Sequence, residues 1–438
     1  TRKSSLVDQN LASFFGRVNY KLMDRYMLTA SLRADGSSVF APGKKWGYFP
    51  SVALAWRINE ENFLKNVDAI SNLKLRLSWG QSGQCAIDPY QTVGLLGNST
   101  YSFNNEGAYG FYPKTMSNKE LTWETTTQYN LGLDFGFFNN RISGSIDIYK
   151  AETRDILMNR VIPSINGYAS VMENIGKTES TGVDLTLSTV NIQNKNFSWF
   201  SDFSLSHNRE KIKELASGQL KDEANAWFVG EPFKVFYDYK KEGIWQLGEE
   251  AAAAANGQEP GDIKVQDVDG NGVITTDDRI IYSQRPDVTF GFNNTFNYKG
   301  FDLSVFLYAR LGQWIAYDYN TTYRINALEN GGNVDYWTPE NPTNAFPRPN
   351  KSKSYTQVTY YSTLKYEDGS FFKIRDITLG YTFKPELLKH LNLSRLRVYA
   401  TAKNFFTFSK IDNYDPEQGG SISFPMTKQL VFGLNVEF

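Results

Sequence analysis

Long segments of alternating hydrophobicity constrain the fold of this 438-residue chain more than any other feature. In TTTQYNLGLDFGFF, which begins at Thr125, apolar residues occupy the odd positions from Tyr129 to Phe137, and polar residues or glycine occupy the even positions. This period of two is typical of a β-strand with one apolar face. After two asparagines the pattern restarts in RISGSIDIY, which predicts a tight hairpin between two long strands.

Segments of this kind recur along the chain and predict about thirteen strands, several longer than ten residues. Strands of about 9 to 11 residues cross a bilayer, whereas most strands of soluble proteins have about five or six. The predicted connections alternate between short and long along the chain. The link near 36–45 is a compact member of the long set. The short links are 21–25, 58–71, 139–140, 191–196, 299–300 and 384–393, and the long ones are 83–121, 154–172, 209–284, 314–370 and 408–427.

Short turns on one side and long loops on the other are typical of outer-membrane barrels. We therefore predict an all-β fold, a transmembrane antiparallel β-barrel in the outer membrane of a Gram-negative bacterium. Its long loops, above all 209–284 and 314–370, are expected to be extracellular. A soluble β-sandwich is the alternative, but it requires frequent turns rather than long loops on one side.

The predicted direction of the strands indicates a larger barrel. Counting back from residue 438, the first strand near 14–20 also runs toward the periplasm, so the strand number is odd. Single-chain barrels of this type close with an even number of strands. We therefore expect residues 1–438 to be the C-terminal portion of a single barrel domain of 22 strands with a plugged lumen.

Composition excludes several classes of function. The chain has 46 Lys and Arg against 47 Asp and Glu, so its charge does not favour a nucleic-acid partner. It has one cysteine and two histidines, which excludes an intrachain disulfide and gives little support to a histidine metal site or a Ser/His triad. Nor does any local motif indicate the close carboxylate pair of a glycoside hydrolase. We expect no enzymatic activity.

The segment DVDGNGVITTDD, residues 267–278, follows the ligand order of an EF-hand calcium loop. Its flanks contain proline, glycine and β-branched residues, so the helices of an EF-hand are not predicted. We expect a calcium ion to hold the 209–284 loop together. The alternative is a solvated Asp/Asn/Gly turn without an ion. Asp277 competes with Asp278 for the role of the last ligand. The candidate ligands are Asp267, Asp269, Asn271, the Val273 carbonyl and Asp278.

Aromatic side chains in the long loops are candidates for substrate binding, because flat apolar rings stack on sugars or on peptide side chains. The alternative is that they pack the loops or form the interfacial girdle of a barrel. The candidates are Trp227, Phe228, Trp245, Trp314, Tyr317, Tyr319, Tyr336 and Trp337.

Several motifs together resemble the SusC/RagA-type TonB-dependent outer-membrane transporters of Bacteroidetes. They include FGRVNY, LTASLRADGSS, WGYFPSVALAWRI, GDIKVQDVDGNGVITTDDRIIY, FFKIRDITLGYTF and the terminal Phe438. The resemblance implies import of an oligosaccharide or a peptide, a SusD-like surface lipoprotein as a lid, and energy from the TonB complex. It also implies that Phe438 is read by the outer-membrane assembly machinery.

Of these substrates we expect a glycan first and a peptide second. Two other functions remain as alternatives. One is a TonB-dependent receptor for siderophores or vitamins. The other is a soluble, calcium-stapled adhesin or carbohydrate-binding protein.

The last strand predicts which side chains contact outer-membrane lipid. Alternation places Val431, Gly433, Asn435 and Glu437 toward the lumen. The lipid-facing set is Leu430, Phe432, Leu434, Val436 and Phe438.

Overall fold

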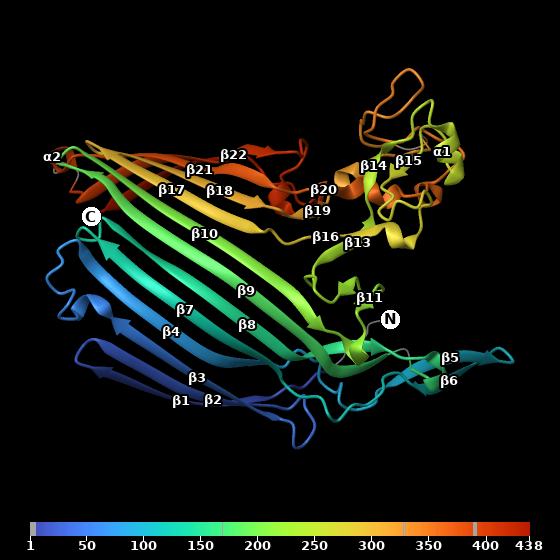
Figure 1. The fold of residues 1–438 in the computed structure, drawn as a ribbon, viewed down its shortest axis with the longest axis horizontal. Coiled ribbons are helices and arrows are strands. Elements are labelled where there is room, and N and C mark those ends of the chain that lie inside the picture. The colour runs from blue at the N-terminus through green and yellow to red at the C-terminus, as the bar shows by residue number, and fades with distance from the viewer. Residues whose placement is uncertain (1–5, 169, 327, 329, 389–391) are drawn as a thin grey trace. The chain divides into compact units, whose positions relative to one another are not determined.

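The computed structural model describes residues 6–168, 170–326, 328, 330–388 and 392–438. Thirteen long strands form one sheet in the described chain, and each neighbours the next along the sequence (Figure 1). They are β1 (Leu11–Leu22), β2 (Tyr26–Ser37), β3 (Trp46–Arg57), β4 (Ile70–Gln84), β7 (Glu124–Phe137), β8 (Ile142–Val161), β9 (Ser170–Gln193), β10 (Phe197–Glu214), β17 (Val288–Tyr298), β18 (Phe301–Leu311), β21 (Phe371–Thr382), β22 (Arg395–Ser409) and β23 (Gln429–Glu437).

Shorter elements lie in the connections. The strands are β5 (Leu96–Phe103), β6 (Glu106–Pro113), β11 (Lys221–Asp222), β12 (Trp227–Phe228), β13 (Val235–Tyr239), β14 (Lys241–Ile244), β15 (Ile263–Val265), β16 (Arg279–Ser283), β19 (Trp314–Ala316) and β20 (Tyr366–Asp368). The α-helices are α1 (Glu250–Ala255) and α2 (Pro385–Leu388). The 3-10 helices are η1 (Ile58–Glu60), η2 (Ser164–Asn166), η3 (Ala216–Gly218), η4 (Thr276–Asp278), η5 (Asp318–Thr322), η6 (Tyr355–Gln357), η7 (Tyr361–Lys365) and η9 (Pro416–Gln418).

The chain divides into two compact units. The first comprises Thr1–Thr189 and His207–Phe233, and the second comprises Val190–Ser206 and Lys234–Phe438. Strands β9 and β10 contribute residues to both units. Pairing is antiparallel from β1 to β9 and again from β17 to β23. No described helix is long and apolar enough to cross a membrane.

All thirteen strands expected from the alternation are present. The tight turns have the backbone that two-residue hairpins require, as at Lys299 (φ 45°) and Gly300 (φ 93°) between β17 and β18. The expected short link 384–393 lies partly outside the described residues, which omit 389–391. The period of two therefore predicts the pairing of neighbouring strands correctly.

One expected long loop is wrong. The link predicted at 154–172 is confined to 162–169, because β8 and β9 continue to pair on both sides of an irregularity between Thr153 and Ile156. Asp155 lies within this irregularity and has φ 58°, which breaks the alternation of apolar and polar residues. The second half of β8 therefore cannot be recognised from a period of two.

The two faces of the sheet differ in the first unit as the alternation predicts. On one face, Arg76 of β4 donates to Asp134 of β7 (Nε to Oδ1, 2.9 Å) and to Asp147 of β8 (Nη2 to Oδ2, 2.8 Å). The neighbouring positions point the other way and expose apolar side chains. They are Leu77, Leu131 and Ile148, which are paired across the three strands. An exposed apolar face opposite a polar one suits a sheet between lipid and a wet lumen.

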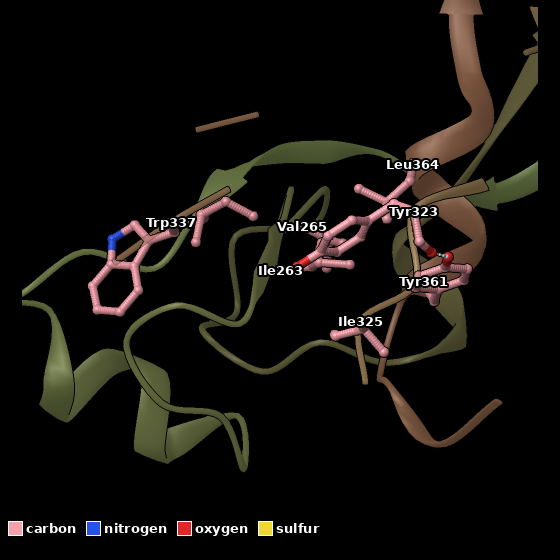
Figure 2. Close-up of a cluster of buried hydrophobic side chains, with 8 residues drawn as sticks. Ile263, Val265, Tyr323, Ile325, Trp337, Tyr361 and Leu364 are labelled. Atoms are coloured by element: carbon pink, nitrogen blue, oxygen red, sulfur yellow. Dashed lines mark hydrogen bonds between the residues drawn. The ribbon is translucent and has the colours of Figure 1, made fainter. Parts of the chain in front are cut away.

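Two long connections of the second unit fold together. The segments 234–286 and 312–370 form a structure that we call the loop module, which contains β13 to β16, β19, β20 and α1 (Figure 1). Its hydrophobic core joins residues from both segments (Figure 2): Ile244, Ile263, Val265, Tyr323, Ile325, Trp337, Tyr361 and Leu364. The long loops predicted at 209–284 and 314–370 thus contribute to one packed structure.

A two-stranded hairpin, β5 and β6, interrupts the link between β4 and β7 in the first unit (Figure 1). Its aromatic side chains are largely exposed, with Tyr109 at 82% and Phe111 at 71%. On the other face Tyr101 and Phe103 are also exposed, and their rings lie 4.8 Å apart. Isolated hairpins are marginally stable in water, so a hairpin with two aromatic faces suits contact with another surface.

Candidate functional site

The acidic loop at 267–278 lies between β15 and β16, and the helices of an EF-hand are absent from its described flanks, as expected from the sequence. Asp267 begins the loop and folds it back on itself. Its Oδ1 accepts from the Gly270 amide at 2.8 Å, and its Oδ2 accepts from the Gly272 amide at 2.7 Å. Gly272 has φ 83°, a conformation that favours glycine, so this residue permits the sharp turn that brings its amide to the carboxylate.

Asp278 closes the loop from its far end. It is fully buried, and its carboxylate accepts from the backbone amides of Thr275 (2.7 Å) and Val268 (2.8 Å). The hydrogen bond from the Thr275 amide has the largest effect on the pKa of the Asp278 carboxyl and lowers it below its ordinary value. Burial opposes this shift, and further hydrogen bonds support it. This carboxylate is therefore held ionised.

Three carboxylates converge in this loop. One oxygen each from Asp267, Asp269 and Asp278 lies within 4.8 Å of the others. Among the described residues, the group of converging carboxylates contains Asp278 and not Asp277. The Asn271 side-chain oxygen accepts from the Val273 amide at 2.8 Å, so the remaining candidate ligands lie on the same turn. Such a set of oxygens has the chemistry that a hard cation such as calcium prefers.

Half of the aromatic candidates are buried. Phe228, Trp245, Tyr317 and Trp337 are 8%, 7%, 4% and 5% exposed. The Trp245 indole donates to the Gln258 side chain at 2.8 Å and Trp337 to the Gln246 side chain at 2.8 Å, which fixes both rings inside the loop module. The expectation that these four rings offer open stacking faces is wrong in this structure, because packing within the loops covers them.

The other four aromatic candidates remain more accessible. Trp227 packs edge-on against Phe233 (5.8 Å between ring centroids), and Trp314 packs edge-on against Tyr282 (4.7 Å). Tyr319 stacks on the buried Tyr317 at 5.8 Å. Tyr336 is the most open, at 42%. Trp227 belongs to the first unit and the other three to the second, so the sequence candidates do not form one described cluster.

Trp227 lines a pocket of about 460 Å³ in the first unit. Asn159 and Arg160 from β8 form part of its wall, and Gln219 and Asp222 come from the segment that follows β10. The Arg160 guanidinium is oriented by Glu173, with Nη2 to Oε1 at 2.7 Å. An aromatic side chain among amide and charged groups gives this pocket both a stacking surface and hydrogen-bonding partners.

The polar wall of this pocket is not predictable from the sequence pattern. Asn159, Arg160 and Gln219 lie in segments read as loop, and polar loop residues give no periodic signal. The extension of β8 beyond its bulge brings Arg160 to Trp227, and only the three-dimensional structure reveals this.

Comparison with known proteins gives consistent results. The family model described as TonB dependent receptor-like, beta-barrel matches residues 1–405. TonB-dependent receptor P26 of Formosa agariphila is 35% identical over 460 residues, which cover 98% of this chain and 46% of the relative. TonB-dependent receptor SusC of Bacteroides thetaiotaomicron is 35% identical over 463 residues, covering 98% of this chain and 44% of SusC.

Among solved structures, that of the RagAB peptide transporter matches with a TM-score of 0.83 and 27% identity, over 99% of this chain and 48% of that chain. The RagAB peptide importer in its open-open state matches with a TM-score of 0.80 and 28% identity, over 98% and 47%. The chain thus spans about half the length of the relatives it matches.

Proposed function

The chain belongs to the TonB-dependent receptor-like β-barrel family, an outer-membrane family of transport proteins rather than enzymes, and we propose that the whole protein imports an oligomeric nutrient. The observation that carries this proposal is the sheet itself. It combines one exposed apolar face, one face crossed by ion pairs, and a loop module and hairpin in its long connections. A wide lumen of this type is plugged at rest, so transport needs energy coupling, which we assign to TonB.

The substrate class that we propose is an oligosaccharide. The Trp227 pocket supports it, because an indole beside Asn159, Gln219 and Asp222 offers a sugar both a ring face and partners for its hydroxyl groups. A peptide is the second candidate, and it is favoured by the similarity to the RagAB peptide transporter.

A SusD-like surface lipoprotein is the proposed partner. A weakly bound oligomer must be retained above the lumen, which a lid achieves. The β5–β6 hairpin offers a contact surface for it, because tyrosine, phenylalanine, serine and glycine together give large contact area with adaptable hydrogen bonding. Exposed rings such as Tyr109 and Phe111 are the residue types that anchor protein interfaces.

We further propose that calcium binds the acidic loop. Asp267, Asp269 and Asp278 supply carboxylates, and Asn271 and the Val273 carbonyl supply neutral oxygens. Without a cation, three converging carboxylates repel one another. A bound ion would join both ends of the turn between β15 and β16 and stiffen this part of the loop module.

Uptake of labelled oligomers tests the proposed import. A strain lacking the protein should lose uptake of its oligosaccharide and recover it with the wild type. Trp227→Ala should reduce uptake by about tenfold, the size of a lost stacking contact of roughly 1 to 2 kcal/mol. Phe138→Ala is the matched control, because Phe138 is an exposed aromatic residue in the turn between β7 and β8.

The same strain separates the alternatives. Loss of peptide uptake with normal glycan uptake would assign the protein to the peptide class. Loss of iron-chelate or vitamin uptake alone would assign it to the siderophore and vitamin receptors. If the deletion changes none of these, the import proposal is refuted.

A further inference from the structure

A charged surface of the first unit lies on three neighbouring strands, β8, β9 and β10 (Figure 1). It begins on β8 directly after Ile148, which belongs to the exposed apolar face of the sheet. Residues two apart on a strand share a face, so Lys150, Glu152 and Arg154 continue the face of Ile148. The side chains on this face therefore change from apolar to charged along β8.

Ion pairs bring residues of β9 and β10 to the same face. The Glu179 carboxylate of β9 contacts Lys150 of β8 (Nζ to Oε2, 2.9 Å) and Lys211 of β10 (Nζ to Oε1, 3.0 Å). Arg209 and Lys213 lie two positions before and after Lys211, so alternation places them on this face of β10, and both are exposed. The three strands thus form one charged surface, which we call the cationic patch.

The outermost groups of the cationic patch are cations. Glu152 lies opposite Glu179 in the pairing of β8 with β9, and it contacts Lys177 and Arg154. The side chains of Glu179 and Glu152 are 10% and 21% exposed, whereas those of Lys150 and Arg154 are 55% and 64% exposed. The carboxylates therefore lie beneath the cations that they hold.

Positive charge is in excess across the patch. Its six cations are Lys150, Arg154, Lys177, Arg209, Lys211 and Lys213. Its carboxylates are Glu152 and Glu179, and Asp155 in the adjoining irregularity adds a third whose charge acts on Arg154. Within the residues that the structure describes, Arg209 and Lys213 make no ion pair. A cluster of exposed cations beside a lipid-facing surface attracts anionic lipid head groups.

An apolar groove of about 380 Å³ adjoins the cationic patch. Leu131, Ile148 and Val183, which pair across β7, β8 and β9, form part of its lining. The next row on this face adds Tyr129 and Lys150 to the lining. Aromatic and basic side chains beside an apolar band are typical of the level where hydrocarbon meets head groups. The groove therefore suits an acyl chain whose head group lies at the patch.

We propose that the cationic patch binds the phosphate groups of an anionic lipid in the outer leaflet, with Arg154, Arg209 and Lys213 contacting phosphate and an acyl chain lying in the groove. The outer leaflet follows from β10, which leads into the long connection predicted to be extracellular. Lysine and arginine form charge-assisted hydrogen bonds with phosphate. A soluble anion would make no use of the groove, and an uncharged lipid would leave the excess positive charge without a partner. The inference does not depend on the imported substrate.

Native mass spectrometry of the purified whole transporter, released from detergent, tests the proposal by titration. The probes are lipid A, which bears phosphate groups, the same lipid after enzymatic dephosphorylation, and inorganic phosphate. The wild type should bind one lipid A at least tenfold more tightly than the dephosphorylated lipid. Raising the salt concentration before the measurement should reduce this preference, because salt screens exposed charges. Inorganic phosphate should not displace lipid A at equal concentration, since it lacks the acyl chain.

Arg209→Gln combined with Lys213→Gln should weaken lipid A binding by about fivefold for each lost cation. Binding of the dephosphorylated lipid should not change. These two residues are chosen because their replacement leaves the ion pairs of Glu152 and Glu179 intact. The matched control is Lys114→Gln combined with Lys119→Gln, which removes two exposed cations of the first unit from the connection before β7.

Arg154→Gln provides a second variant on another strand. Glu152 keeps Lys177 as its partner in this variant, and lipid A binding should again weaken by about fivefold. If the double variant fails to fold, as loss of the heat-dependent gel shift would show, Arg154→Gln decides the outcome.

Equal binding of lipid A and its dephosphorylated form would overturn the proposal, as would an equal loss in the control variant. Displacement of lipid A by an equal concentration of inorganic phosphate would overturn the lipid assignment and leave a site for free phosphate. Because lipid binding is measured without transport, a failed uptake experiment would count against import and not against the lipid site.

Discussion

Arg397 of β22 donates to Asp302 of β18 across the intervening strand β21, with Nε to Oδ1 at 2.9 Å. The two side chains meet above Gly380, where an added Cβ would lie 2.6 Å from both Arg397 and Asp302. Glycine therefore permits an ion pair to span three strands. The first unit repeats the arrangement, because Arg76 reaches Asp147 above Gly132.

Replacing this glycine tests whether the bridge stabilises the sheet. Gly380→Val should destabilise the fold by about 1 to 3 kcal/mol, because the new side chain displaces both charged groups. The thermal unfolding midpoint in detergent measures the change. Gly16→Val in β1 is the control, since a Cβ there meets no atom within 4 Å. An equal loss of stability in both variants would show that the cost comes from replacing a strand glycine and not from displacing the ion pair.

The sequence predicts the strands but not the loop module, for a physical reason. Alternation is local, so strands such as β22 and β23 are evident from their own residues. The module core joins Ile244 to Tyr323 and Trp337, which are far apart in sequence and lie in irregular segments. Nothing in a local pattern distinguishes a buried loop tryptophan from an exposed one.

The acidic loop was predictable for a different reason. Its ligand spacing is contained within twelve residues, so the approach of Asp267, Asp269 and Asp278 follows from local turns. Trp227 and Arg160 by contrast come from separate segments, and only the fold brings them to one pocket.

Calcium removal should loosen the acidic loop. Combined Asp267→Ala and Asp269→Ala replacement should increase cleavage of the 209–284 loop by added protease, and a chelator should do the same to the wild type, because both remove the proposed staple. Asp277→Ala should behave as the wild type, since Asp277 lies outside the carboxylate cluster. If cleavage is the same with and without chelator, calcium has no structural role.

The stability of the loop module should fall as pH rises from acid to neutral values, because of one partly buried carboxyl group, that of Glu367. Burial raises the pKa of the Glu367 carboxyl above its ordinary value of 4.5, although Lys241 opposes this. A raised acid pKa means that the folded module binds the proton more tightly than the unfolded chain. This contribution is fully present below pH 4.5 and is lost as pH rises through the folded pKa.

Glu367→Gln should flatten this dependence, and the measurement is protease resistance of the module across that pH range. The amide retains an acceptor for the Asn320 side chain, which donates to Glu367 at 3.0 Å. A wild type whose resistance rises with pH, or a variant with an unchanged profile, would contradict the assignment to Glu367.

The exposed hairpin should contribute to lipoprotein binding. Tyr109→Ser combined with Phe111→Ser removes two rings from one face of β6 and should reduce co-purification of the surface lipoprotein at least tenfold, since exposed aromatic anchors typically contribute about 2 kcal/mol each. Phe63→Ser, an exposed aromatic replacement in the link between β3 and β4, serves as control. Undiminished co-purification would place the lipoprotein contact elsewhere.

The last strand tests the orientation of the whole sheet. Leu434 is 60% exposed and pairs with Val398 of β22, and its neighbour Asn435 pairs with Arg397, a member of the ion-pair bridge. If the bridge lies on the lumen face, Leu434 faces lipid. Leu434→Arg should then cost about 2 to 4 kcal/mol near the bilayer midplane, whereas Asn435→Arg should cost much less.

Urea-dependent refolding into lipid vesicles measures both variants, with the folded fraction followed by the heat-dependent gel shift of barrel proteins. A larger loss for Asn435→Arg than for Leu434→Arg would reverse the assignment of faces, because a shift by one residue moves every side chain of a strand to the opposite side. Phe438, 91% exposed just beyond β23, shares the phase of Leu434. Its deletion should lower surface levels in cells without altering refolding in vesicles, since its predicted role is recognition by the assembly machinery rather than stability.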